Sequence, residues 1–247
     1  MRKSLLICRR ELGVLFGGPT AWVLAAVFAL LGGYFFYSDL AFYVLFGGAS
    51  LPRGLWRYVF LDLRLVALLV IPLVTMRLVA EERKLGTLEL LWTCPVRDRE
   101  VLAGKFLAAL ALYLLMLAVT AVGPLLLYVL HPFAPGPLLA GYAGMVLLGV
   151  AFIACGLAAS AVTENQVVSA MLTYGVLVFF WFVSWNEAAI GERIAPVLLA
   201  LSLFDRFYGF AQGVIDSRDV AYLLALTGLF LFLAHRALGA RAWRGIA

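Results

Sequence analysis

Apolar residues gather in long uninterrupted stretches along this chain, and short polar segments separate these stretches. A helix needs about 20 mostly apolar residues to cross the roughly 30 Å hydrocarbon core of a bilayer. Six stretches meet that requirement, at residues 20–38, 59–76, 105–130, 138–161, 166–185 and 220–238. They lack the alternation of a transmembrane β-barrel. The pattern therefore predicts an all-α polytopic membrane protein with six transmembrane helices.

Two shorter segments predict helices that do not cross the membrane. Residues 2–16 mix basic and leucine side chains, and Gly17-Gly18-Pro19 follows them. We expect a helix that lies on the inner membrane face and bends into the first span. The run from Ile194 to Phe204 is too short to cross and too apolar for a free loop. It predicts an interfacial or re-entrant helix on the outer side.

Composition and charge support the same class and give an orientation. Of the 247 residues, 65% are hydrophobic and 13% are charged, which is too little polar surface for a soluble domain of this length. With both termini inside, 13 of the 19 Lys and Arg residues fall in cytoplasmic segments and 6 in external ones. Lys and Arg favour the cytoplasmic side. The net charge of +5 thus reports topology in the inner (cytoplasmic) membrane, and we expect no nucleic-acid partner.

The connection between the second and third spans predicts a small structured element. Gly86 is suited to end one helix in the left-handed conformation, and Thr87 is suited to cap the next. Glu89 then falls in the first turn, where the helix dipole favours an anion, and Pro95 stops the helix. The sequence therefore predicts a short charged coupling helix in the cytosol. Between spans four and five, Thr163 and Gln166 fit a capping box.

Three motifs occur in order along this topology. The first is Glu81-Glu82-Arg83, then Gly86-Thr87-x-Glu89, then Pro95, with Lys105 opening the next span. The second is Ser160-x-x-Thr163-Glu164-Asn165-Gln166, and the third runs from Gly213 to Tyr222. Together they resemble the type-2 ABC exporter permeases, most closely the gliding-motility-associated permease subunits. Since the likeness covers nearly the whole chain, residues 1–247 are expected to form a single permease domain. Arg206-Phe207 departs from the His-Phe pair that relatives often carry.

The resemblance implies a half-transporter whose cytoplasmic helices fit a groove on a separate ATPase. The residues it assigns to coupling are Glu81, Glu82, Arg83, Gly86, Thr87, Glu89, Pro95, Lys105 and Glu164. We expect Glu82 and Glu89 to lie in water and to offer charge to the ATPase. The alternative is that these charges only solvate a juxtamembrane loop. The other expected partners are a second permease copy or a paralogue, the lipid bilayer, and a periplasmic subunit as a further candidate.

Few ionisable residues fall within the predicted spans, which disfavours a proton-driven transporter. Asp62 and Arg64 lie at the outer end of span two, where each is expected to reach water or the other. Span four carries closely spaced small residues at Ala151, Cys155 and Ala159, and at Gly156 and Ser160. Such spacing lets helices approach closely. We favour packing within one subunit over a dimer interface.

Common catalytic motifs are missing from the sequence. No stretch fits GxxxxGK followed by Ser or Thr, and neither GxSxG nor HExxH occurs. Cys8, Cys94 and Cys155 lack metal-ligand spacing. We therefore expect a transporter subunit without its own ATPase site or cofactor, with ATP bound by the partner. A non-transporting ABC-type membrane anchor or force transmitter for another envelope machine is the alternative function, and the cargo is not encoded in any motif.

Overall fold

The computed structural model describes residues 2–46, 51–86, 97–183 and 201–242. Within these ranges the chain is helical and has no strand, which confirms the all-α prediction. The helices are α1 (Arg2–Gly17), α2 (Pro19–Phe46), α3 (Leu51–Thr75), α4 (Ala80–Lys84), α6 (Asp98–Thr120), α7 (Val122–Leu130), α8 (Gly136–Val162), α9 (Gln166–Phe182), α11 (Leu203–Ala211) and α12 (Ser217–Ala242).

Five of the predicted spans correspond to helices long and apolar enough to cross a membrane. These are 19–45, 54–84, 98–130, 136–162 and 217–239. The protein is therefore a multi-pass membrane protein. Helix α9, which covers most of the predicted fifth span, is apolar but has only 17 residues in the described part. The crossing predicted over residues 166–185, and with it the total of six spans, stays a prediction, because residues 184 and 185 lie outside the described ranges.

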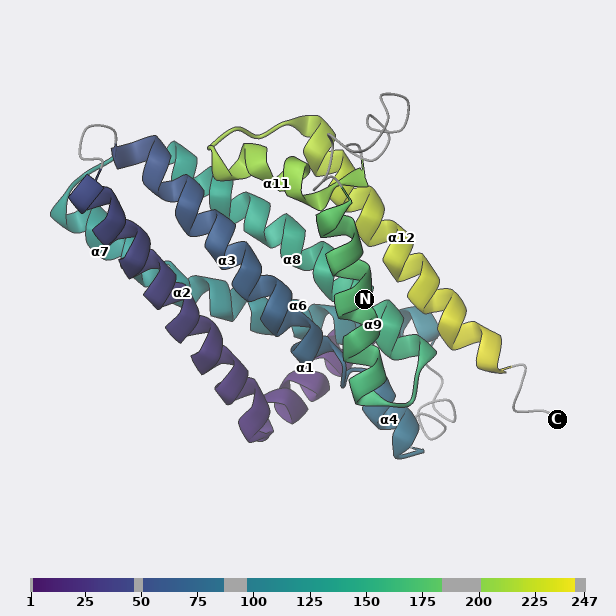
Figure 1. The fold of residues 1–247 in the computed structure, drawn as a ribbon. Helices are drawn as coiled ribbons and strands as arrows, with labels where there is room; N and C mark the ends of the chain where they lie inside the picture. The colour runs from purple at the N-terminus through teal and green to yellow at the C-terminus, as the bar shows by residue number, and fades with distance from the viewer. Residues whose placement is uncertain (1, 47–50, 87–96, 184–200, 243–247) are drawn as a thin grey trace, which may run out of the picture.

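Helix α8 runs through the middle of the bundle and packs against α3, α6, α9, α11 and α12 (Figure 1). Its small residues make this close packing possible. A Cβ at Gly149 would stand 2.0 Å from Tyr113, and one at Gly156 would stand 2.0 Å from Thr75 Oγ1. Ala151, Cys155 and Ala159 are buried against the same core. The prediction that the small residues of span four pack within one subunit is confirmed.

Helix α1 meets α2 at a sharp elbow, where Gly18 separates them and Pro19 begins α2 (Figure 1). The predicted break at Gly17-Gly18-Pro19 is thus confirmed. Helix α1 packs along the start of α6, where a Cβ at Gly104 would stand 2.6 Å from the Ile7 side chain. The position of α1 on a membrane face stays a prediction.

Helix α11 lies at the opposite end of the bundle from α4 (Figure 1). Ser202 Oγ accepts a hydrogen bond from Asp205 N at 3.3 Å, and this cap sets the start of α11. An ion pair of 2.9 Å joins Arg206 to Asp219 at the start of α12. Most of the helix predicted over Ile194 to Phe204 lies outside the described residues, and only its last residues belong to α11.

Arg64, in α3, is enclosed by aromatic rings at this end of the bundle. Only 4% of its surface is exposed, and its guanidinium lies 4.0 Å from the centroid of the Trp181 ring. Phe207 lies on it too, with its ring centroid at 5.5 Å. Of the two alternatives expected for Arg64, water is excluded by this burial, whereas the interaction with Asp62 fits, because the two groups interact electrostatically. A guanidinium is weakly hydrated and stacks well on aromatic faces, which allows this enclosure.

Candidate functional site

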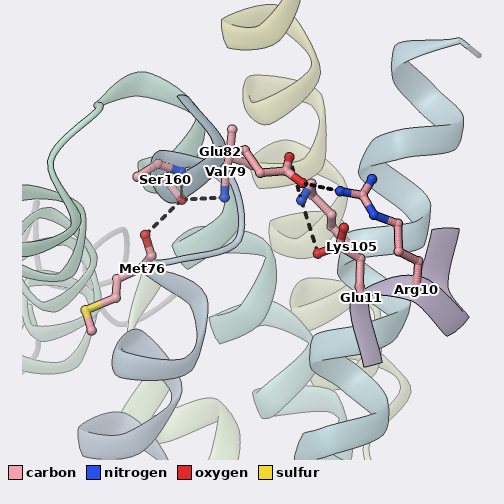
Figure 2. A network of polar contacts seen from close by, with 8 residues as sticks. Arg10, Glu11, Met76, Val79, Glu82, Lys105 and Ser160 are labelled. Carbon is pink, nitrogen blue, oxygen red and sulfur yellow. Dashed lines mark hydrogen bonds and ion pairs between the residues drawn. The ribbon is translucent and has the colours of Figure 1, made fainter. Parts of the chain in front are cut away.

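The chain leaves α3 at Thr75 and turns into α4, and one buried hydroxyl group holds this turn in place by hydrogen bonds. Ser160, near the end of α8, accepts hydrogen bonds from Val79 N at 3.1 Å and from Ala80 N at 3.0 Å. It donates to Met76 O at 3.2 Å (Figure 2). The first amides of a helix have no partner within the helix. Ser160 therefore caps α4 from a different helix and fixes its start to α8.

Lys105 lies at the centre of a second contact network. Its ammonium stands 2.8 Å from Glu82 Oε2, on α4, and 3.2 Å from Glu11 Oε2, on α1 (Figure 2). Arg10 adds a longer pair to Glu82 at 3.6 Å. We call Arg10, Glu11, Glu82 and Lys105 the buried charge cluster, of which Arg10 is the exposed outer member. It joins α1, α4 and α6 through two positive and two negative groups, so its formal charge is zero.

Burial determines what this cluster does for the fold. Lys105 is 1% exposed and Glu11 is 7% exposed. A charge taken out of water is tolerated only when it is paired, and removing one partner of a buried pair typically costs about 3–5 kcal/mol. The cluster thus holds α4 in one position relative to α1 and α6.

Glu82 therefore does not lie in water, and that prediction is wrong. Its side chain is 16% exposed and faces Lys105. The error came from treating the whole run of charges at 81–84 as one solvated face. In a helix, neighbouring residues point in directions about 100° apart, so one member of such a run faces inward while the next faces solvent.

Two arginines tie the same region to other helices. Arg83 donates from Nη1 to Ala161 O, at the end of α8, at 2.8 Å. Arg77 donates from Nη1 to Thr20 Oγ1, at the start of α2, at 3.1 Å. The short segment from Met76 to Gly86 is thus joined by side chains to α1, α2, α6 and α8. It is a fixed part of the bundle rather than a tether.

The remaining predicted residues of this region lie on the surface. Lys84 and Gly86 are exposed, and Glu81 is half-buried. Gly86 has φ of +68°, which confirms the predicted left-handed end of the helix. Lys84 lines a groove of about 340 Å³ together with Glu164 and the first residues of α9. Thr87, Glu89 and Pro95 lie outside the described residues, so the helix predicted there stays a prediction.

The turn between α8 and α9 is capped differently from the prediction. Asn165, and not Thr163, is the N-cap of α9, and its Oδ1 accepts from Val167 N at 2.9 Å. Thr163 Oγ1 instead accepts from Asn165 N at 3.1 Å. The predicted capping box of Thr163 and Gln166 is wrong. Asn is at least as good an N-cap as Thr, so this sequence offered two overlapping caps.

Sequence reasoning missed Arg10 and Glu11, as well as the capping role of Ser160. One signal was available in the sequence, since Glu11 is the only acid in an otherwise basic N-terminal segment. Partial burial, and to a lesser extent the charge of Glu11, raises the pKa of the nearby Cys8 thiol. That thiol therefore stays protonated near neutral pH.

Comparison with known proteins gives one family match. The family model described as ABC-2 family transporter protein matches residues 5–204, which include most of α1, all of α4 and α6, and the whole buried charge cluster. No curated protein gives a significant match to the chain.

Proposed function

Because the chain belongs to the ABC-2 family of transporter proteins, we propose that it is the membrane-spanning permease subunit of an ABC exporter. A separately encoded ATPase drives it and docks on the segment 77–104. Membership of this family implies an ATPase partner in general. We also propose that transport is outward, that the ATPase docks on this segment, and that the chain is similar to the gliding-motility permeases.

The observation that carries the proposal is the link from α4 to the bundle through Lys105. The pairs of 2.8 Å to Glu82 and 3.2 Å to Glu11 connect α4 to α6 and α1. Ser160 and Arg83 connect the same segment to α8, which packs against most of the other helices. A displacement of α4 would therefore move the spans as well, because these contacts join α4 to α1, α6 and α8.

The surface beside this link supports docking. Glu81, Lys84 and Glu164 present both signs of charge, and Leu85 is 67% exposed. A mixed-sign face with an exposed apolar side chain suits a specific protein interface, because complementary charges fix register while apolar contact adds affinity. The groove lined by Lys84 and Glu164 joins α4 to the α8–α9 turn, so both lie on one docking surface.

The topology assigned to this permease follows from charge. Helices α1 and α4 and the starts of α2 and α6 lie at one end of the bundle, with the end of α12 (Figure 1). This end carries most of the basic residues, which supports a cytoplasmic position for it by the positive-inside rule. We assign both termini to the cytoplasmic side of the inner membrane. A second permease copy or a paralogue completes the pathway, and the chain has no ATPase site of its own.

The test uses the purified chain and the ATPase that co-purifies with it. We expect no ATP turnover from the chain alone and a clear rise in the turnover of the ATPase when the chain is added in proteoliposomes. ATP turnover by the chain alone, or an ATPase whose turnover does not change when the chain is added, would contradict the proposal. A force transmitter would also stimulate the ATPase, so efflux of a lipid or hydrophobic dye from the same vesicles separates the two functions.

A further inference from the structure

A groove of about 650 Å³ runs between α6 and α12, at the end of the bundle that holds α1 and α4. The two helices are antiparallel, since α6 begins and α12 ends there (Figure 1). Both belong to candidate membrane spans. The lining residues are Arg99, Leu102, Ala103, Phe106, Leu107, Leu231, Phe232, His235 and Arg236. None of them belongs to the buried charge cluster or to the groove lined by Lys84 and Glu164, although Arg99, Leu102 and Ala103 fall within the segment 77–104 on which the ATPase is proposed to dock.

Polar and apolar side chains are separated along the length of this groove. Arg99 lies in the first turn of α6 and Arg236 near the end of α12, so both stand at the same end. With a rise of about 1.5 Å per residue, Leu107 lies about 12 Å deeper than Arg99, and Leu231 about 8 Å deeper than Arg236. The groove therefore has a cationic mouth and an apolar interior. This arrangement is complementary to an anionic amphiphile, which has a negative headgroup and an apolar tail.

No acidic side chain lines the mouth of the groove among the described residues. Both arginines are exposed, and no ion pair joins either of them to a carboxylate in the part of the chain that the structure covers. Arg236 instead packs over Phe232, with its guanidinium carbon 5.1 Å from the ring centroid. His235 Nδ1 is buried and has no hydrogen-bond partner among the same residues. Lys105, six residues after Arg99, is in contrast held in ion pairs with Glu11 and Glu82.

We propose that this groove is a binding site for an anionic glycerophospholipid. Its headgroup phosphate lies between Arg99 and Arg236, and one acyl chain follows Phe106, Leu107 and Leu231. A planar guanidinium group can bind two phosphate oxygens at once through two parallel hydrogen bonds. Basic pockets between membrane helices bind anionic headgroups. A zwitterionic lipid would leave the positive mouth uncompensated, and a free phosphate would leave the apolar interior empty. The lipid would brace α12 against α6.

Native mass spectrometry of the purified chain tests this site with two lipids of identical acyl chains, phosphatidylglycerol and phosphatidylcholine. A basic residue beside an anionic headgroup contributes about fivefold to binding. We therefore expect a preference for phosphatidylglycerol that falls about 25-fold in the double variant Arg99→Gln/Arg236→Gln. Ala103→Phe fills the groove without changing charge and should remove binding as well. Arg9→Gln, an exposed arginine on α1 outside the groove, should leave the preference unchanged.

Three results would overturn the proposal. The first is equal binding of the two lipids by the parent chain, which needs no variant and holds even if one variant fails to fold. The second is an unchanged preference in both the double variant and Ala103→Phe. The third is displacement of the lipid by an equal concentration of glycerol phosphate, since that would make the mouth an anion site without a lipid. The readout does not involve ATP, so it is independent of the proposed transport function.

Discussion

Lys105→Met removes the charge at the centre of the buried charge cluster while keeping an unbranched side chain of similar length. At about 3 Å and an effective dielectric constant of about 20, each of its two ion pairs is worth about 5–6 kcal/mol of Coulomb energy. Desolvation of the ammonium offsets several kcal/mol of that gain. The variant, however, leaves two carboxylates behind. We therefore expect a loss of about 3–5 kcal/mol, the range found when one partner of a buried pair is removed.

The loss should fall unequally on the two carboxylates. Glu82 keeps Arg10 at 3.6 Å, whereas Glu11 loses its ion pair with Lys105 and is 7% exposed. Adding Glu11→Gln to Lys105→Met should therefore recover more than half of the lost stability, because a neutral amide replaces the unpaired charge. Replacing a buried ion pair by neutral groups is often close to neutral in stability.

Thermal unfolding of the detergent-solubilised protein measures both effects. A loss of this size corresponds to a fall in melting temperature on the order of 10 °C. Lys84→Met is the matched control, because it makes the same change at an exposed lysine of α4 and should melt with the parent. If Lys105→Met also melts with the parent, or if Glu11→Gln lowers stability further, the cluster does not hold these helices together as argued.

Three further predictions concern the cap, the docking surface and the topology. Ser160→Ala should lower stability by about 1–3 kcal/mol because two buried amides lose their acceptor. Ser169→Ala, at a fully buried hydroxyl without a hydrogen-bond partner in the described residues, should cost less in the same melting assay. Glu81→Lys and Glu89→Lys should reduce stimulation of the ATPase without changing the melting temperature. Glu82→Lys should lower both the stimulation and the melting temperature. If Glu81→Lys and Glu89→Lys stimulate the ATPase normally, these charges only solvate a loop. In a chain without its native cysteines, a maleimide should label Gly136→Cys from outside and Leu85→Cys only after the membrane is opened, and the reverse would invert the topology.

The fold was predictable where one pattern of side chains had one structural solution. Long apolar runs gave the spans, and Gly17-Gly18-Pro19 gave the elbow, because a bilayer leaves the backbone few alternatives. Gly86 was placed correctly since only a residue without a Cβ adopts its φ without strain. Ser160 was recognised as part of a motif, but its partners lie about 80 positions away along the chain. No local pattern reports such a contact.

The candidate site was predicted in part, and its errors share one cause. Charges at 81–84 lie close together in sequence, but Glu82 turns inward while Lys84 stays exposed. Which of them pairs with Lys105 depends on where α1 and α6 pack, and that depends on contacts such as Ile7 against Gly104. The aromatic enclosure of Arg64 could not be predicted for the same reason, since Trp181 and Phe207 reach it from other helices.

Photocrosslinking tests most directly whether an ATPase docks on the end of the bundle that holds α4. A photoreactive residue replaces Leu85, which is 67% exposed beside α4, or Val214, which is 59% exposed at the opposite end. The complex with the co-purifying ATPase is then irradiated in membranes. The account predicts an adduct with the ATPase from position 85 and none from position 214. An adduct from position 214 alone, or from neither position in an intact complex, would contradict it.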